Sequence, residues 1–200
     1  MFPVDIDVPY VDNLGQRGYA DMIEKLVAAE AKSFNPSQFK EARSKRSVED
    51  FSFQGNLTTW YDVKSFDVDS DFSMPNLISI DRLRKVMADP NQELVYILVD
   101  YRLDHTNRDV VVQNVEFRPI YTIDPSVLAI QNLGKGVLQV KNMHNSLDRY
   151  TGTKEEWMKA ISIMAHNFYA KQISKFKKLQ STWAWLRLFT HHSKSAKQRS

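Results

Sequence analysis

Hydrophobic and polar positions along the chain predict a mixture of helices and strands. Apolar residues recur at three- and four-residue steps over about residues 19–31, and a second helix is expected at about 77–88. The C-terminal helix has the clearest start, because Thr153-Lys154-Glu155-Glu156 has the spacing of a capping box. Large apolar residues then recur at mostly helical steps as far as Leu186, so we expect a long helix over 153–188.

Strand patterns occupy the middle of the chain. The run 94–99 is apolar on both parities, as expected of a central strand that is covered on both faces. The other predicted segments are a hairpin with arms 48–53 and 57–64, strands 109–117 and 137–140, an extension or new strand at 120–123, a short helix from Asp124, and a loop or short helix over 33–46. The predicted fold class is α/β, with a mixed central β-sheet flanked by helices and a long C-terminal helix.

Composition narrows the class of protein. The 200 residues are 42% hydrophobic and 12% aromatic, which excludes a disordered chain and suits one domain over 1–192 with a flexible basic tail at 193–200. There is no cysteine, so disulfides, Cys-based zinc sites and thiol nucleophiles are excluded. No apolar run reaches the roughly 18 residues of a membrane span, and the first residues do not resemble a signal peptide. We therefore expect a cytoplasmic protein with no membrane partner.

The net charge of +3 hides an uneven distribution. Residues 171–200 hold eight basic residues and no acidic residue, so this segment carries +8 and the first 170 residues carry −5. Such a basic segment suits contact with phosphates, and it also suits a simple solvated tail.

Candidate chemistry lies on the predicted hairpin. In Asp62-Val63-Lys64, strand alternation places Asp62 and Lys64 on one face and turns Val63 towards the core. If the turn centres near Gly55, Asp50 on the other arm faces Trp60 and is a diagonal neighbour of Asp62.

Two carboxylates this close need a cation, and together with a backbone carbonyl they suit Mg²⁺. A lysine beside them can orient the attacking water or help to deprotonate it, which is the chemistry of phosphodiester hydrolysis. Glu24, among apolar neighbours on the first helix, is a candidate third acid. Two plainer interpretations remain open, namely an exposed hairpin end with scattered charges and a surface glutamate on the helix.

Four stretches, in chain order, carry a family resemblance: Ile23-Glu24-Lys25-Leu26-Val27, Asp62-Val63-Lys64, Pro75-Asn76-Leu77-Ile78-Ser79 and Gly152-Thr153-Lys154-Glu155-Glu156-Trp157. They resemble the PD-(D/E)xK nucleases, and within them the HincII-like type II restriction endonucleases. The likeness extends over about residues 15–180. It implies a restriction-endonuclease-like core in which Asp50, Asp62 and the Val63 carbonyl hold Mg²⁺ and Lys64 positions the water.

The same resemblance implies residues that contact DNA. Asn76 would lie near the groove, and Asn132 matches an asparagine that contacts base edges in the family, a role that suits a side-chain amide. Ser73 stands where the family has an intercalating glutamine, and Lys135 changes the recognition segment. We therefore expect a sequence specificity that differs from that of the family.

The leading hypothesis is a Mg²⁺-dependent type II restriction endonuclease that cleaves double-stranded DNA at a short palindromic site, with a metal-bound water as nucleophile. A chain of this length holds one catalytic site, so cleavage of both strands favours a homodimer. The family also implies a bacterial source and a cognate DNA methyltransferase. Two alternatives remain: a structure-specific repair or phage nuclease of the same fold, and a non-catalytic DNA-binding module.

Overall fold

A computed structural model describes five segments of the chain, with side chains described as far as residue 183: 2–42, 49–70, 76–131, 136–141 and 149–196. The chain divides into two compact units, Met1–Met158 and Lys159–Ser200. The first unit contains every strand of the two described sheets, and the second consists of helix in its described part.

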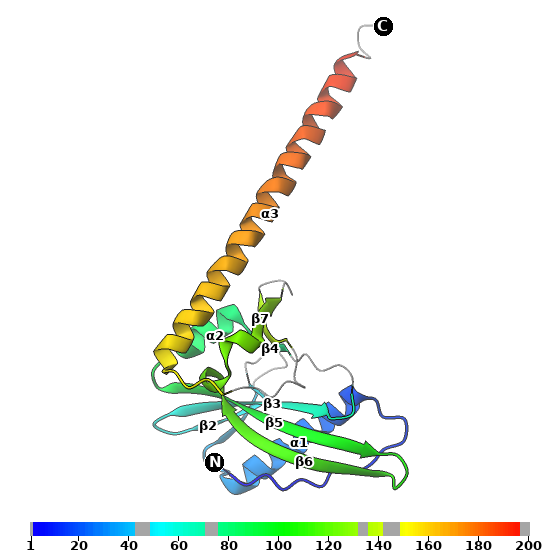
Figure 1. Ribbon diagram of the computed structural model, residues 1–200, viewed down its shortest axis with the longest axis vertical. Helices are drawn as coiled ribbons and strands as arrows, with labels where there is room; N and C mark the ends of the chain where they lie inside the picture. Colours follow the sequence, from blue (N-terminus) through cyan, green and yellow to red (C-terminus); the bar gives the residue numbers. More distant parts are fainter. Residues whose placement is uncertain (1, 43–48, 71–75, 132–135, 142–148, 197–200) are drawn as a thin grey trace. The chain divides into compact units, whose positions relative to one another are not determined.

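The larger sheet of the first unit has five strands. Its order is β1-β2-β3-β5-β6, with bounds Phe39–Glu41, Phe51–Gln54, Thr58–Asp67, Gln92–Asp104 and Asp109–Pro119. The two long central strands, β3 and β5, run parallel, and the other neighbours are antiparallel. Figure 1 labels β2, β3, β5 and β6 of this mixed sheet.

A smaller sheet has three antiparallel strands in the order β4-β8-β7, with bounds Asn76–Ser79, Val137–Val140 and Leu128–Gln131. Two short 3₁₀ helices, η1 (Ile120–Thr122) and η2 (Pro125–Val127), connect β6 to β7. Helix α2 (Ile80–Met87) follows β4 directly. It buries Leu83 and Val86 and contacts both β4 and β5.

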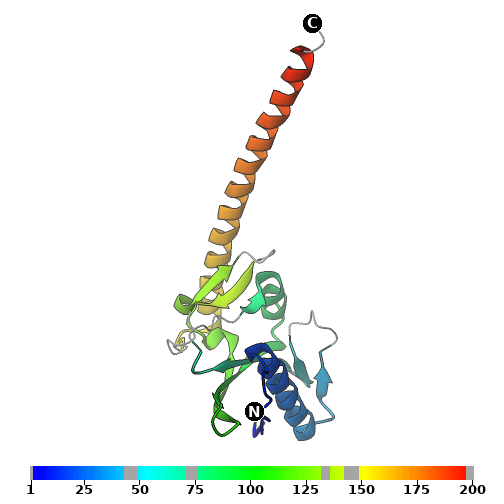
Figure 2. The ribbon, with the colours of Figure 1, turned by 90° about the vertical axis from the view of Figure 1, so that its right-hand side faces the viewer.

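Helix α1 (Gln16–Phe34) lies against the large sheet, as Figure 2 shows. Its residues Ile23 and Val27, which are completely buried, join the core that β3 and β5 supply from Val63 and Ile97. These strand residues have odd numbers. Strand alternation therefore turns the even-numbered side chains, including Asp62, to the other face of the sheet.

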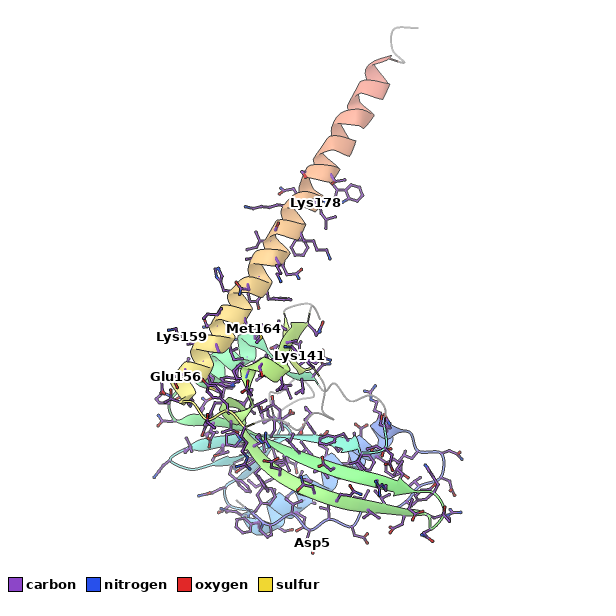
Figure 3. The ribbon with its side chains drawn as sticks, viewed as in Figure 1. Asp5, Lys141, Glu156, Lys159, Met164 and Lys178 are labelled. Atoms are coloured by element: carbon purple, nitrogen blue, oxygen red, sulfur yellow. The ribbon has the colours of Figure 1, made fainter. Side chains whose placement is uncertain are left out.

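Helix α3 (Lys154–Ala196) begins with the capping box that the sequence predicts. The Thr153 amide donates to Glu156 Oε2 at 2.8 Å, and the Glu156 amide donates to Thr153 Oγ1 at 3.2 Å. Glu156 is labelled at the start of this helix in Figure 3. Trp157 is completely buried, and its indole Nε1 donates to the Ile123 carbonyl at 2.7 Å, which holds the first turn of α3 in place within the first unit.

The predicted mixed α/β class is confirmed. The two hairpin strands, the central strand, the strands at 109–117 and 137–140, the first and last helices and the short helix after Asp124 are all present. None of the helices in the described part of the chain has the length and apolar character needed to cross a membrane.

Three local predictions were wrong. The segment 76–79 is strand β4, so the second helix begins only at Ile80. Residues 120–122 form a 3₁₀ helix instead of a strand, and part of the predicted loop over 33–46 is edge strand β1.

Candidate active site

The β2–β3 hairpin brings the two candidate aspartates together in a register that differs from the predicted one. Phe51 pairs with Tyr61 and Ser52 with Trp60, so the turn centres on Asn56 and not on Gly55. A shift of one residue in the centre moves every partner by two residues. Asp50 therefore lies beside β3 opposite Asp62 instead of Trp60, and its amide donates to the Tyr61 carbonyl at 2.8 Å.

Asp62 and Lys64 form a partly buried ion pair on the even-numbered face of β3. Lys64 Nζ lies 2.5 Å from Asp62 Oδ2, and both side chains are largely withdrawn from solvent. On the neighbouring arm, Asp50 Oδ2 accepts a hydrogen bond from the Val63 amide at 2.7 Å. This bond holds the Asp50 carboxylate against the backbone of the Asp62-Val63-Lys64 segment.

Glu24 reaches the same cluster from helix α1. A hydrogen bond joins the side chains of Glu24 and Asp50, and Lys64 is close enough to interact electrostatically with both. Burial raises the pKa of Glu24, and the nearby Asp50 carboxylate raises it further. The structure thus brings all four predicted catalytic side chains together from one helix and one hairpin.

Burial has the largest effect on the pKa values of the acidic groups in this cluster. Burial raises the pKa of Asp62 to about 7, even though the Lys64 ammonium opposes the shift. Burial also raises the pKa of Asp50, against the lowering effects of the Val63 amide and Lys64. Among the described residues, the three acidic groups thus interact with one ammonium, that of Lys64. An additional positive charge at the cluster would stabilise their ionised forms.

The Val63 carbonyl, the third predicted metal ligand, lies 3.4 Å from Lys64 Nζ. The donors of the cluster are hard oxygen atoms, which are the atoms that Mg²⁺ prefers. Within the described segments, however, no three His, Cys, Asp or Glu side chains are arranged as a ready-made metal site. Instead, the Lys64 ammonium is the positive group that lies beside the Asp62 carboxylate.

Sequence reasoning missed a polar row that crosses the sheet from Asp62. In the observed register Asp62 pairs with Tyr96 of β5, and Tyr96 pairs with Arg118 of β6. Tyr96 is completely buried, and in the described structure its hydroxyl has no hydrogen-bond partner. Burial, with the nearby Asp62 and Asp50, raises the pKa of Tyr96 well above its usual value. The signal was the tyrosine in the otherwise aliphatic run 94–99, but its place beside Asp62 depends on a pairing that the sequence does not reveal.

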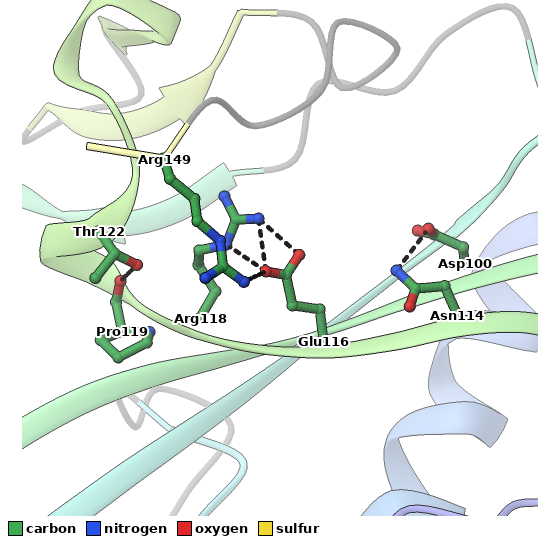
Figure 4. A network of polar contacts seen from close by, with 7 residues as sticks. All are labelled: Asp100, Asn114, Glu116, Arg118, Pro119, Thr122 and Arg149. Carbon is green, nitrogen blue, oxygen red and sulfur yellow. Dashed lines mark hydrogen bonds and ion pairs between the residues drawn. The ribbon is translucent and has the colours of Figure 1, made fainter. Parts of the chain in front are cut away.

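At the β6 end of this row, Glu116 accepts from two arginines, as Figure 4 shows. Arg118 Nη2 lies 2.6 Å from Glu116 Oε2 and Arg149 Nη2 lies 2.9 Å from Glu116 Oε1. Arg118 is buried, whereas the Arg149 side chain is mostly exposed. Next to this network, Asn114 Nδ2 donates to Asp100 Oδ2 at 3.3 Å. One polar row, Asp62–Tyr96–Arg118, therefore crosses the even-numbered face of the sheet between the buried apolar residues Leu94 and Leu98.

Of the residues expected to contact DNA, Asn76 is the one that the structure describes. It is exposed at the first position of β4, where it pairs with Gln139 of β8. Ser73, Asn132 and Lys135 lie outside the described residues.

Comparison with known proteins does not assign the chain to a family. No protein-family model matches the sequence, and a search of curated proteins also gave no match.

Proposed function

We propose that the protein is a Mg²⁺-dependent type II restriction endonuclease with a PD-(D/E)xK catalytic centre. The observation that carries this proposal is the convergence of Asp50, Asp62, Lys64 and Glu24. A helix and the two arms of a hairpin supply these residues, although 40 positions separate the first from the last. A hairpin end with scattered charges does not explain why Asp62 is 8% exposed or why the Asp50 carboxylate is held on the β3 backbone.

Each residue has a role that follows from its position. Asp50 and Asp62, with the Val63 carbonyl, would hold Mg²⁺, which when bound supplies Lewis acidity at the scissile phosphate. Glu24 bonds to Asp50 and fixes that carboxylate from the side of α1. Lys64 stands beside Asp62, and its ammonium is placed to orient a water molecule.

Duplex DNA is the proposed substrate, and a homodimer would present one such cluster to each strand of a palindromic site. Asn76 and the segment that contains Asn132 and Lys135 would read the half-site. A host that produces such an enzyme needs a cognate methyltransferase to protect its own DNA.

The decisive experiment compares two lysine variants with the wild-type protein. Lys64→Ala removes the ammonium at the cluster, and Lys85→Ala removes one from the exposed surface of α2, where Lys85 pairs with Asp81. We expect Lys64→Ala to bind DNA in Ca²⁺ but to lose cleavage in Mg²⁺, and Lys85→Ala to cleave normally. Circular dichroism checks that both variants are folded. Near-normal cleavage by Lys64→Ala would refute the catalytic assignment.

The products of DNA cleavage distinguish a restriction endonuclease from a structure-specific nuclease. Phage DNA incubated with the protein and Mg²⁺ should give discrete fragments whose sequenced ends share one palindrome. A smear, or preferential attack on single strands or junctions, supports a structure-specific nuclease of the same fold. If Asp50→Asn and Asp62→Asn both leave the DNA-related activity unchanged, the carboxylates are structural and a non-catalytic binding module explains the chain better.

A further inference from the structure

The second unit presents a row of large apolar side chains that are exposed. Ile173, Phe176, Leu179 and Trp183 of α3 expose 55%, 64%, 45% and 69% of their surface. At 3.6 residues per turn these four positions fall within an arc of about 120° around the helix. An apolar stripe of this kind on a described surface indicates a binding partner more than it indicates a solvated spacer.

Lysines border this apolar stripe. Lys175 and Lys177 fall on either side of it, and Ser174 lies on the opposite face of the helix. Figure 3 labels Lys159 and Lys178 on the same helix. Lysine stems can lie along an apolar surface while their ammonium groups reach outwards, so the two bordering lysines extend the stripe and surround it with positive charge.

The segment of the chain after Glu156 carries only positive charges. After Glu156 the chain has nine basic residues and no acidic residue. The apolar character also continues along the sequence past the last described side chain, because six of the seven residues in Trp183-Ala184-Trp185-Leu186-Arg187-Leu188-Phe189 are apolar. The partner must therefore accept apolar side chains and carry negative charge.

We propose that α3 binds the surface of a bilayer that contains anionic lipids, with the stripe Ile173, Phe176, Leu179 and Trp183 in the headgroup and acyl boundary. Such a surface takes up the apolar side chains and attracts the flanking lysines at the same time. A second copy of the segment after Glu156 would bring nine further positive charges and no carboxylate to pair with them. Duplex DNA would neutralise the lysines but leave the stripe in water.

This proposal goes beyond the nuclease assignment, and it replaces the expectation of no membrane partner. The helix lies along the surface and does not cross the membrane, in keeping with the absence of a long apolar span among the described helices. A nuclease bound in this way would act on DNA close to the membrane.

The test uses the full-length protein and vesicles of two compositions, phosphatidylcholine alone and equal parts of phosphatidylcholine and phosphatidylglycerol. Leu179→Glu and Ser174→Glu form a matched pair, because both add one negative charge to α3 on opposite faces. We expect the wild-type protein to sediment with the anionic vesicles and not with the neutral ones. Leu179→Glu should weaken this binding at least about tenfold more than Ser174→Glu, since it also removes an apolar anchor.

Three results would overturn the proposal. The first is no sedimentation of the wild-type protein with anionic vesicles. The second is an equal loss in the two variants, which would mean that charge alone drives binding. In the third, the wild-type protein does not bind vesicles, but Leu179→Glu changes the oligomeric state or the affinity for duplex DNA. A changed oligomeric state would assign the stripe to a second copy of the chain, and a changed DNA affinity would assign it to DNA. Plasmid cleavage in solution tests the proposed nuclease separately, so the two proposals can fail independently.

Discussion

Replacing Asp62 by asparagine should make the metal-free protein more stable at neutral and basic pH. Burial raises the pKa of Asp62 from 3.8 to about 7. Between pH 4 and pH 7 the folded protein therefore holds a proton at this site that the unfolded chain has lost. The free energy of unfolding must then fall as the pH rises through this window, and the full penalty is present above pH 7.

The size of this effect follows from the shift. Each pKa unit corresponds to about 1.4 kcal/mol, so a shift of about three units costs the folded state up to about 4 kcal/mol at pH 8 and about 2 kcal/mol at pH 5. Asp62→Asn keeps the shape of the side chain and removes this cost. Part of the gain is offset because Lys64 loses its ion-pair partner. We therefore expect a net stabilisation of about 1–4 kcal/mol at pH 8 that shrinks towards pH 5.

Urea unfolding in chelator at pH 5, 6, 7 and 8 measures this difference. The matched control is Asp81→Asn on the surface of α2, where a hydrogen bond from Lys85 lowers the pKa of the carboxyl. At pH 8 the free energy of unfolding of Asp81→Asn should be equal to or lower than that of the wild type, whereas that of Asp62→Asn should be higher. Mg²⁺ should then stabilise the wild-type protein and not Asp62→Asn. If Asp62→Asn is less stable than the wild type by a constant amount at every pH, burial does not penalise this carboxylate and the reasoning is wrong.

Three further substitutions test other parts of the structure. Glu24→Ala should lower the rate of DNA cleavage at least about tenfold while circular dichroism stays unchanged, because it removes the carboxyl group that bonds to Asp50 and holds that metal-binding carboxylate in place. An unaltered rate would show that Glu24 has no part in the site. Trp157→Phe should cost about 2–4 kcal/mol in urea unfolding, since it leaves the buried Ile123 carbonyl without its donor and opens a small cavity. Thr153→Ala should cost about 1 kcal/mol by removing the cap that Glu156 completes, and a change within error would show that the first turn of α3 does not depend on it.

Sequence patterns predicted the long helices and strands, and also the element that begins with a recognisable capping motif. The capping box at Thr153 carries its own hydrogen-bond partners within four residues, so no tertiary information was needed. The run 94–99 identified the central strand because a segment apolar on both parities must be covered on both faces. The first helix was predicted with both ends three residues inside the observed bounds. The strand predicted at 109–117 has the observed start, Asp109, and ends two residues before the observed end, Pro119.

Short elements were predicted less well. The residues at 76–79 place Leu77 and Ile78 in the interior, and a four-residue segment with two adjacent buried positions fits either a strand or the start of a helix. Strand β1 has three residues and lies at the sheet edge, where only Phe39 is buried, so it has no alternation to detect. Pro119 precedes the 3₁₀ helix at 120–122, and its effect on the chain direction depends on tertiary packing.

For the candidate site, the sequence predicted its members but not all of its geometry. Asp62 and Lys64 share a face through strand alternation alone, and Asp50 was placed near them by the hairpin. The contact with Glu24 depends on how α1 crosses the sheet, which periodicity does not specify. Tyr96 was missed because the parallel pairing of β3 with β5 joins segments separated by the whole of β4 and α2.

The ion pair between Lys64 and Asp62 links the stability of the fold to the chemistry proposed for it. Among the residues that the structure describes, Lys64 is the one ammonium that balances the three acidic groups, and even so the pKa of Asp62 is raised to about 7. A second positive charge at the carboxylates would lower that pKa and release Lys64 from its role as counter-ion, leaving its ammonium available to orient a water molecule. The buried negative charge that destabilises the metal-free fold is therefore the same feature that would favour cation binding. A purely structural ion pair would need neither a raised Asp62 pKa nor two additional acids beside it.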